Sequence, residues 1–277
     1  MTDTYAVIGN PIAHSKSPQI HAAFARQTLQ DMVYTTIFCE TGAFMRTVQA
    51  FRAIGGKGLN VTLPFKHEAY DLATRRSVSA QQAGAVNTLS FIEGAMQGDN
   101  TDGVGLVHDI TRNLQFDLRD KRLLLLGAGG ASFGVAGPLL ACAPRSLTIA
   151  NRTVAKAVEL RARFAAHGKV DACGYDALGA RTFDLVINAT SAGLGGTMPA
   201  LPGTLFAPHA LAYDMVYGKI TPFLQFARAQ GARIADGLGM LVEQAAESFF
   251  IWRGVRPETT PVMALLRREV PDVGRHT

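Results

Sequence analysis

The stretch Leu123-Leu124-Leu125-Leu126-Gly127-Ala128-Gly129-Gly130-Ala131-Ser132 joins a continuous apolar run to a cluster of glycines. Four consecutive leucines are typical of a strand that is covered on both faces, as in a parallel sheet. Glycines at the start of a helix allow positive φ and let backbone N–H groups approach a pyrophosphate, where the helix dipole favours negative charge. The stretch therefore predicts a strand, a dinucleotide-binding turn and a helix.

The turn departs from the usual fingerprint, G-x-G-x-x-G or G-x-G-x-x-A, because Ser132 stands at its last position. Taken alone, such a turn fits a loop of no special function equally well. Its surroundings favour the dinucleotide site. Residues 132–141 contain one helix breaker, Pro138, and residues 147–151 are typical of a second strand, so a β-α-β unit of the expected size is complete.

The second strand of this unit indicates which cofactor is bound. An NAD site usually carries Asp or Glu there to hold the ribose hydroxyls. Here the strand ends in Asn151-Arg152-Thr153, with Lys156 one turn later. These bases could be ordinary surface charges at a helix start, but a guanidinium can also hold the 2′-phosphate of NADP in a bidentate fork. We therefore expect NADP(H) rather than NAD.

The remainder of the chain alternates strand-like and helix-like segments, which predicts an α/β fold with a largely parallel sheet. The 277 residues are 48% hydrophobic, enough for a sizeable core. In the first hundred residues the expected strands cover 5–8, 34–39, 59–63, 83–89 and 95–99. A second, doubly wound region has expected strands at 123–126, 147–150, 183–187 and 210–213, and a long loop at 191–207 that we expect to border a cleft.

Composition argues against several classes of protein. No apolar run approaches the roughly 20 residues of a membrane span, and the N-terminus lacks the pattern of a signal peptide, so we expect a cytoplasmic protein that does not bind a membrane. Cys39, Cys142 and Cys173 are far apart and predict neither disulfides nor a metal site. The net charge of +5 is scattered, which favours small anions over nucleic acid as ligands.

Four polar side chains stand at positions where ligands gather. Ser15 and Ser17 precede a helix that starts at Pro18, with Ser17 as the expected cap; both hydroxyls could cap or could bind a substrate carboxylate. Lys66 follows the third expected strand, and ligands of open α/β sheets gather at the carboxyl ends of strands. Asp102 begins an amphipathic helix, where it could act as a cap, face a ligand, or do both.

Seven motifs in fixed order resemble the shikimate dehydrogenase family over essentially the whole chain. They are GNPIAHSKSP (9–18), NVTLPFK (60–66), GAVNT (84–88), GDNTDG (98–103), GAGGAS (127–132), NRT (151–153) and DGLGML (236–241). The resemblance implies reversible, NADPH-dependent reduction of 3-dehydroshikimate to shikimate, in the route to aromatic amino acids. It also implies a substrate domain formed by 1–102 plus 239–277, with a Rossmann domain inserted at 103–238.

The resemblance assigns roles to residues of this sequence. Lys66 and Asp102 would be the acid–base pair. Ser15, Ser17 and Tyr217 would hold the substrate carboxylate, whereas Thr62, Asn87 and Gln244 would contact the ring hydroxyls. The cofactor would be bound by Gly127, Ala128, Gly129, Gly130, Ala131, Asn151, Arg152, Thr153, Lys156, Met215 and Gly237. We expect a monomer or a homodimer.

The pair also makes chemical sense, because hydride delivered to a ketone leaves an alkoxide that needs a proton, which a lysine ammonium can supply. Two alternatives remain at this point: a catabolic quinate/shikimate dehydrogenase, and a non-catalytic NADP-binding sensor. A sensor has no need of a proton-transfer pair, so the presence of Lys66 and Asp102 favours an enzyme.

Overall fold

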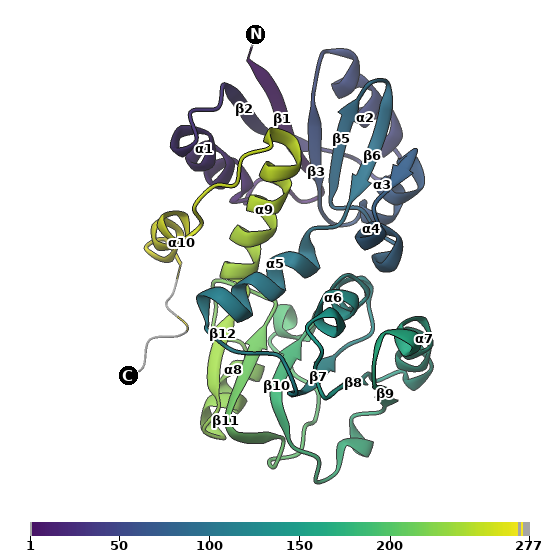
Figure 1. Cartoon of the computed structure of the whole chain (residues 1–277), viewed down its shortest axis with the longest axis vertical. Helices are drawn as coiled ribbons and strands as arrows, with labels where there is room; N and C mark the ends of the chain where they lie inside the picture. The colour runs from purple at the N-terminus through teal and green to yellow at the C-terminus, as the bar shows by residue number, and fades with distance from the viewer. Residues whose placement is uncertain (1, 271–272, 274–277) are drawn as a thin grey trace. The chain divides into compact units, whose positions relative to one another are not determined.

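The computed structural model describes residues 2–270 and 273 and divides into two compact units (Figure 1). Unit 1 comprises the chain up to Gly105 together with Val242–Val262. Unit 2 comprises Leu106–Leu241 and the described residues from Met263 onward. The expected division placed all of 239–277 with the first part of the chain, whereas the structure groups the segment after Val262 with unit 2.

Unit 1 is built on a mixed sheet of six strands in the order β2-β1-β3-β5-β6-β4. Its strands are β1 (Asp3–Gly9), β2 (Met32–Phe38), β3 (Gly58–Val61), β4 (Arg75–Arg76), β5 (Thr88–Ile92) and β6 (Ala95–Asp99). β1 pairs in parallel with β2 and β3, but β5 runs antiparallel to both β3 and β6. Three of the five strand pairings in this sheet are parallel, as expected, and β5 alone runs antiparallel to its two neighbours. The two-residue turn Glu93–Gly94, with both residues at positive φ, joins β5 and β6 as a hairpin.

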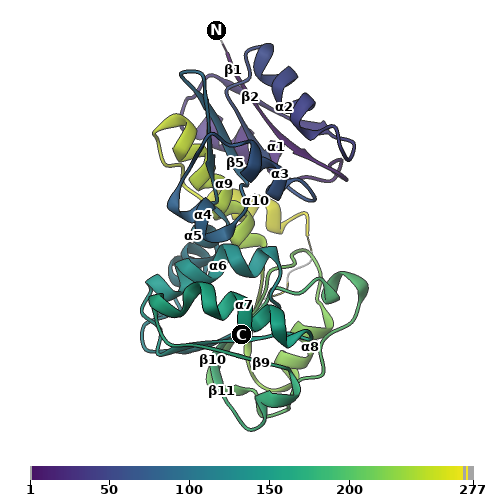
Figure 2. The same ribbon diagram turned by 90° about the vertical axis from the view of Figure 1, so that its right-hand side faces the viewer.

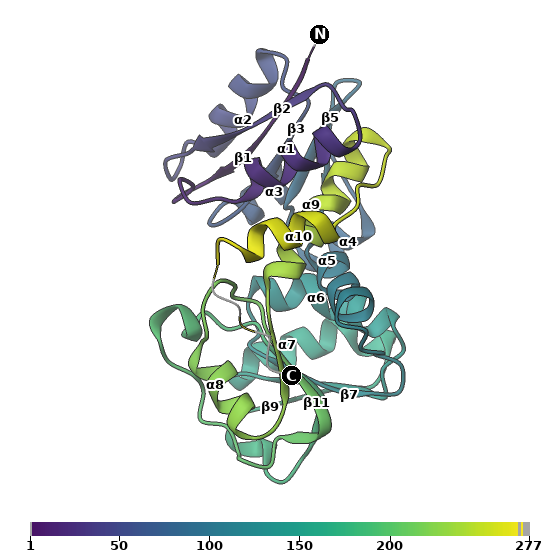
Figure 3. The same ribbon diagram turned by 90° about the vertical axis from the view of Figure 1, so that its left-hand side faces the viewer.

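Helices cover both faces of this sheet (Figures 1 and 3). They are α1 (Ser17–Gln27), α2 (Phe44–Ala53), α3 (Lys66–Leu72), α4 (Val78–Ala83) and most of α9 (Leu238–Arg253). Phe44 and Phe51 of α2 pack with Ala6, Ile8 and Phe65 in one core layer. On the other face, α9 meets β1 and α1 meets β2 through stacked aromatic side chains, and α1 meets α9 through an edge-to-face aromatic pair.

That aromatic layer encloses His21, which is fully buried. Its ring stacks on Tyr34 with 4.1 Å between ring centroids, and both ring nitrogens lack a hydrogen-bond partner among the described residues. Burial lowers the pKa of His21 to about 3, and the nearby Asn60 side chain acts in the opposite direction. Neutral His21 thus serves as part of the core.

Unit 2 is built on a fully parallel sheet of six strands in the order β12-β11-β10-β7-β8-β9. Its strands are β7 (Arg122–Leu126), β8 (Ser146–Ala150), β9 (Val170–Cys173), β10 (Phe183–Asn188), β11 (Phe206–Asp214) and β12 (Arg233–Asp236). The chain order runs outward from β7 in both directions, so the switch point lies between β7 and β10. Ligands of doubly wound sheets bind at this place, beyond the carboxyl ends of the strands.

The four leucines show why both faces of this sheet are covered. Leu123 and Leu125 pack into one layer and Leu124 and Leu126 into another, and all four are fully buried. The first layer is closed by α5 (Asp102–His108), the π-helical turn Asp109–Asn113, α6 (Gly130–Ala141) and α7 (Val154–Phe164), as Figure 2 shows for α6 and α7. The second is closed by α8 (Pro222–Ala229). The expected doubly wound α/β region is confirmed.

Several expected boundaries are wrong. The strand expected at 83–89 starts at Thr88, because Gly84 adopts a left-handed conformation that ends α4. The strands β9 and β12 were not expected; both are short edge strands of unit 2. Ser17 is the first residue of α1 rather than its cap, which is Lys16; the hydroxyl of Ser15 instead accepts a hydrogen bond from the backbone N–H of Ser17.

Two further findings concern the described part of the chain. None of its helices is long and apolar enough to cross a bilayer. No group of three or more His, Cys, Asp or Glu side chains among the described residues is arranged to hold a metal ion.

Candidate active site

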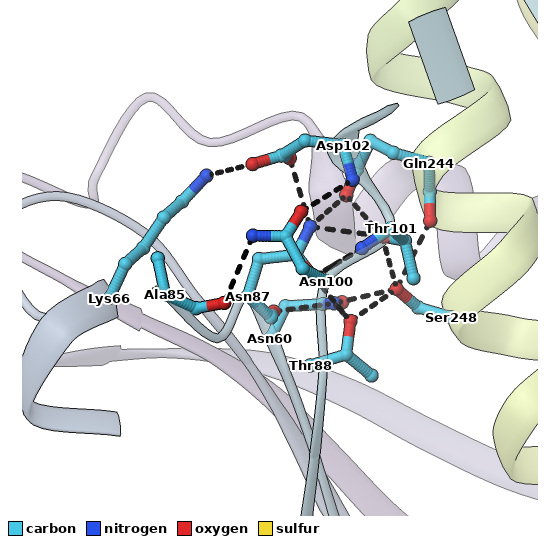
Figure 4. Close-up of polar contacts among 10 residues, drawn as sticks. All are labelled: Asn60, Lys66, Ala85, Asn87, Thr88, Asn100, Thr101, Asp102, Gln244 and Ser248. Carbon is cyan, nitrogen blue, oxygen red and sulfur yellow. Dashed lines mark hydrogen bonds and ion pairs between the residues drawn. The ribbon is translucent and has the colours of Figure 1, made fainter. Parts of the chain in front are cut away.

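Lys66 and Asp102 form a direct ion pair in unit 1 (Figure 4). Lys66 opens α3, five residues after the end of β3, and Asp102 opens α5 soon after β6. Lys66 Nζ lies 2.6 Å from Asp102 Oδ2, and the two side chains are 27% and 14% exposed. The pair is therefore partly shielded from water, which strengthens its electrostatic interaction, yet a ligand can still reach the ammonium group.

Asn87 holds the carboxylate of this pair in place. Its Nδ2 lies 2.9 Å from Asp102 Oδ1 and 2.9 Å from Thr101 Oγ1, while its Oδ1 accepts a 2.9 Å hydrogen bond from the backbone N–H of Thr101. Gln244 Oε1 on α9 lies 3.4 Å from the same Asn87 nitrogen. A buried amide, 3% exposed, thus links the loop before β5 to the start of α5 and to α9.

Asn100 positions Asp102 from its other side. Asn100 Oδ1 accepts a 3.1 Å hydrogen bond from the backbone N–H of Asp102, and its Nδ2 donates to the carbonyl of Ala85 at 3.1 Å. Asp102 therefore does not need to cap α5 with its own side chain, because Asn100 satisfies the first N–H of that helix. Both carboxylate oxygens are left to meet Lys66 and Asn87.

A second layer of hydroxyls and amides lies beneath these groups (Figure 4). Asn60 donates to Ser248 Oγ at 3.0 Å and accepts from the Tyr34 hydroxyl at 2.7 Å. Ser248 in turn lies 2.8 Å from Thr88 Oγ1 and 3.3 Å from Thr101 Oγ1. This layer ties α9 to the strand ends that carry the ion pair, so the pair stands on a rigid, satisfied polar base.

The remaining unit 1 candidates lie on neighbouring loops. Ser15 is half-buried before α1, and Ser17, 8% exposed, lies beside the buried phenol of Tyr34. Thr62 directly follows β3 and approaches the backbone of Gly9, where an added Cβ would lie 2.4 Å from Thr62 Cγ2. Glycine at position 9 therefore lets the loop that carries Ser15 and Ser17 pass close to Thr62.

Unit 2 contains a cavity of about 710 Å³ at the carboxyl ends of β7, β8 and β10. Nine of the expected cofactor residues line it: Gly127, Ala128, Gly129, Gly130, Ala131, Asn151, Arg152, Thr153 and Lys156. The segment 189–192 and residues 197–200 line the other wall, so part of the long loop expected at a cleft borders this cavity. The cavity lies at the switch point of the sheet, as a dinucleotide site requires.

The backbone of the glycine turn fits a phosphate ligand. Gly127 has φ +104°, and an added Cβ there would lie 3.2 Å from Thr190, so glycine is required. A Cβ at Gly129 would meet no atom within 4 Å, which leaves the N-terminus of α6 open to a ligand. Ser132, at the place of the third glycine, is fully buried and donates a 2.9 Å hydrogen bond to the carbonyl of Gly127. The serine therefore fastens the turn instead of disrupting it.

Arg152 and Lys156 are exposed on the wall of the cavity beside β8. Tyr175, which follows β9, lines the same wall, a position that the sequence did not indicate. Burial raises the pKa of the Tyr175 phenol, and neighbouring Arg152 opposes the increase. Two cations and an aromatic ring thus face the place where the adenosine 2′-phosphate of NADP would lie, so these residues fit that cofactor.

Met215 and Gly237 do not line this cavity. Met215 follows β11, and Gly237 follows β12, so both stand on the other side of the switch point from Arg152. An added Cβ at Gly237 would lie 2.3 Å from the Met215 carbonyl oxygen, which shows how closely the two segments pass. Tyr217 also belongs to this loop of unit 2, whereas Ser15 and Ser17 belong to unit 1.

Sequence reasoning missed the residues that support the site. Asn100, Thr101 and Ser248 were not singled out, although Asn100 and Thr101 stand inside a quoted motif next to Asp102. Their polar side chains directly before a helix start were the available signal. Ser248 lies on α9, which the sequence indicates as an apolar helix, and nothing in the sequence separates it from an ordinary buried serine.

The fold and the two sites define a class of protein. A doubly wound parallel sheet with a dinucleotide turn and a basic 2′-phosphate wall is typical of an NADP-dependent oxidoreductase. The ion pair between a lysine and a carboxylate on the other α/β unit is of the chemical type that transfers protons in such enzymes.

Comparison with known proteins specifies the class further. Three family models match: "Shikimate dehydrogenase substrate binding domain" over residues 7–89, "Shikimate / quinate 5-dehydrogenase" over 109–194 and "Shikimate 5′-dehydrogenase C-terminal domain" over 237–267. The shikimate dehydrogenase (NADP(+)) of Nitrosospira multiformis is 59% identical, with 96% of this chain and 98% of the relative covered. The chain belongs to the shikimate dehydrogenase family.

Solved structures of similar fold are in agreement with this family. An Ael1 enzyme from Pseudomonas putida is 50% identical with a TM-score of 0.92, and the match covers 96% of this chain and 98% of that one. Shikimate 5-dehydrogenase from Thermus thermophilus, solved in complex with NADP(H) and shikimate, is 31% identical with a TM-score of 0.86, with 97% and 100% covered.

Proposed function

We propose that this chain is an NADP-dependent shikimate dehydrogenase in which Lys66 and Asp102 transfer the proton. It interconverts 3-dehydroshikimate and shikimate in the synthesis of aromatic amino acids. The observation that carries the mechanism is the ion pair of 2.6 Å between Lys66 and Asp102, partly exposed above a satisfied polar network. When bound, NADPH supplies the hydride.

Lys66 handles the charge that forms on the substrate oxygen. As the carbonyl carbon is reduced, its oxygen becomes an alkoxide, and the Lys66 ammonium stabilises that charge and donates the proton from Nζ. In the reverse direction, the neutral Lys66 amine accepts the proton of the substrate hydroxyl. Asp102 orients the lysine, and Asn87 and Asn100 orient Asp102, so the donor is held in place before the substrate arrives.

Recognition of the substrate rests on polar side chains around this pair. Thr62, Asn87 and Gln244 contact the ring hydroxyls; the hydrogen bonding of Asn87 beside Asp102 supports this role. Ser15 and Ser17 bind the carboxylate, and the contribution expected of Tyr217 to the same role stays a prediction. A site that hydrogen-bonds hydroxyl groups rejects analogues that lack them by orders of magnitude, because its own buried polar groups would be left unpaired.

Different residues bind different parts of the cofactor. The turn Gly127–Ala131 binds the pyrophosphate through backbone N–H groups at the start of α6. Arg152 and Lys156, with Asn151 and Thr153, hold the 2′-phosphate and thereby select NADP over NAD. Met215 and Gly237 contact the other half of the cofactor. A monomer or homodimer without nucleic acid partners, located in the cytoplasm, stays a prediction.

One set of rate measurements tests the assignment. Purified protein is assayed with shikimate and with quinate, each against NADP and NAD, by following reduced cofactor. We expect shikimate with NADP to give the highest kcat/KM. Equal efficiency with quinate, or a preference for NAD, would contradict the biosynthetic function, and no turnover with any pair would indicate a sensor.

A further inference from the structure

The loop that follows β11 is held by the carboxylates of two neighbouring strands. Asp214 and Asp236 are paired in the register of β11 and β12, where each strand ends. Asp214 accepts hydrogen bonds from the backbone N–H of Val216 at 3.0 Å and from Thr221 Oγ1 at 2.5 Å. The Asp214 side chain is fully buried, and this burial raises its pKa.

Asp236 accepts a hydrogen bond from a later residue of the same loop and forms an ion pair with an arginine that is distant in the sequence. Its Oδ2 accepts a 3.0 Å hydrogen bond from the backbone N–H of Gly218. Arg267, the last residue of α10 (Thr260–Arg267), donates to both oxygens, with 2.9 Å between Nη1 and Oδ2 and a second short contact between Nη2 and Oδ1. The Asp236 side chain is fully buried and that of Arg267 is 34% exposed.

Backbone hydrogen bonds also connect this loop to the ends of the neighbouring strands. The backbone N–H of Gly237 donates to the carbonyl of Val216 at 3.2 Å, and that of Met215 donates to the carbonyl of Asn188 at 3.1 Å. A Cβ on Gly237 would overlap the Met215 carbonyl. A displacement of Asp236 would therefore be transmitted to Met215 through Gly237 and through Gly218.

The order of the strands indicates which half of a bound dinucleotide would lie near this loop. The glycine turn follows β7, and the basic wall with Arg152 follows β8 on one side of it. A dinucleotide lies across the carboxyl ends of the strands from its pyrophosphate outward in both directions. With the adenosine half on the β8 side, the nicotinamide half extends over β10 and β11, where Met215 stands.

We propose that Arg267, acting through Asp236, is a positioning residue for the nicotinamide half of the cofactor. This proposal rests on the cofactor role proposed above for Met215. A bidentate guanidinium fixes both the place and the orientation of the Asp236 carboxylate, which a single-point cation would not do. The adenosine half binds on other strands and does not depend on this ion pair.

Two cofactor ligands separate the halves. Binding of NADPH and of 2′-phospho-ADP-ribose, which lacks the nicotinamide, is measured by titration calorimetry for wild type and Arg267→Met. We expect the variant to bind NADPH about tenfold more weakly. Its Kd for 2′-phospho-ADP-ribose stays within about twofold of wild type, because the adenosine wall and the glycine turn are unchanged.

A matched control removes a comparable ion pair from the same sheet. Arg122 also makes a bidentate contact, with Asp184, at the opposite ends of β7 and β10. Arg122→Met should leave both Kd values within about twofold. If Arg267→Met does not fold, the double variant Asp236→Asn with Arg267→Met removes the uncompensated buried charge and is tested in its place.

The outcomes distinguish this proposal from the one on which it rests. If Met215→Ala weakens NADPH selectively but neither Arg267→Met nor the neutral double variant does, the positioning role is wrong. If Met215→Ala has no selective effect, the cofactor role of Met215 is wrong. Equal weakening of both ligands by the Arg267 variant would mean that the ion pair only stabilises unit 2, which also overturns the proposal.

Discussion

The polar cluster of unit 1 and the cofactor cavity of unit 2 are built in different ways. The cluster joins side chains from the loop before β5, the starts of α3 and α5, and α9, which are brought together by the fold. The cavity is lined by four short segments, 127–131, 151–153, 189–192 and 197–200, together with Lys156 and Tyr175. We expect the backbone of the glycine turn to make much of its contact with phosphate. The first depends on the identity of individual side chains, whereas the second depends on the path of the chain.

The difference explains which substitutions each region tolerates. The glycine turn contains a serine in place of the third glycine, and its hydroxyl fits inside the turn. In the cluster, each amide and carboxylate has defined partners, so a change leaves a buried group unsatisfied. We therefore expect single substitutions to have large effects on catalysis in unit 1 and graded effects on binding in unit 2.

The largest effect is expected from Lys66→Ala. Loss of the proton donor should lower kcat by about two orders of magnitude or more, because acid–base catalysis contributes roughly that much. The Kd for NADPH, measured by fluorescence titration, should be little changed, since the cofactor residues lie in unit 2. Near-normal turnover would refute the assigned role. An equal loss of NADPH binding would contradict the claim that substitutions in unit 1 affect catalysis and not cofactor binding.

A second prediction concerns acid stability of unit 1. The pKa of His21 is about 3 in the folded chain, below about 6.5 for an unfolded histidine, so between these values the unfolded chain binds a proton that the folded chain does not. Stability is therefore full above about pH 6.5 and falls as the pH approaches 3. At pH 4.5 this one group should cost about 2–3 kcal/mol.

Urea unfolding at pH 7.5 and pH 4.5 measures that cost. His21→Phe, which keeps an aromatic ring against Tyr34, should lose about 2–3 kcal/mol less than wild type between the two pH values. The matched control is the exposed His14, whose replacement by Phe should leave the acid loss intact. An unchanged acid loss in His21→Phe would show that this buried histidine does not govern it.

A smaller effect is expected from Arg152→Ser. Loss of the guanidinium beside the cavity should weaken NADPH binding by about tenfold or more and leave NADH binding unaltered, because the 2′-phosphate distinguishes the two cofactors. Arg181, exposed after the β9 segment and outside the residues that line the cavity, offers a matched control in Arg181→Ser. An equal loss for NADH would mean that Arg152 does not recognise the phosphate.

The smallest effect is expected from Ser132→Ala. The variant loses the 2.9 Å hydrogen bond to Gly127 and should be destabilised by about 1 kcal/mol in urea unfolding. Because we propose that the backbone of the turn makes the phosphate contacts, NADPH affinity should change by less than about twofold. Unchanged stability would indicate that the serine merely occupies the third glycine position.

The sequence predicted the cavity of unit 2 better than the polar cluster of unit 1. The reason is that the residues predicted for the cavity lie close together in the chain, whereas the cluster joins residues that are far apart. The leucine run, the glycine turn and Arg152 lie within 30 residues of one another, so the local pattern was enough to predict residues that line one cavity of unit 2. Lys66, Asp102 and Gln244 are far apart in the chain; position relative to expected strands suggested the first two, and the resemblance to a family supplied the third. Hydrogen-bond partners such as Asn100 and Ser248 required coordinates.

The errors also have local causes. Gly84 was taken as part of a strand because apolar residues surround it, but its left-handed conformation ends α4 and delays the strand to Thr88. The pairing of β3 with β5 could not be seen from alternating strands and helices, since a hairpin and a crossover can leave similar apolar runs. Serine before proline suggested a cap at Ser17, although the helix already includes that residue.

The central claim, that Lys66 and Asp102 act as one unit, is tested most directly by a double-mutant cycle. The rate of hydride transfer is measured in single turnovers at saturating NADPH and 3-dehydroshikimate for wild type, Lys66→Ala, Asp102→Ala and the double variant. If Asp102 works through the lysine, the double variant should be no slower than Lys66→Ala alone. Losses that add in free energy would contradict the account, because each side chain would then act on the reaction without the other.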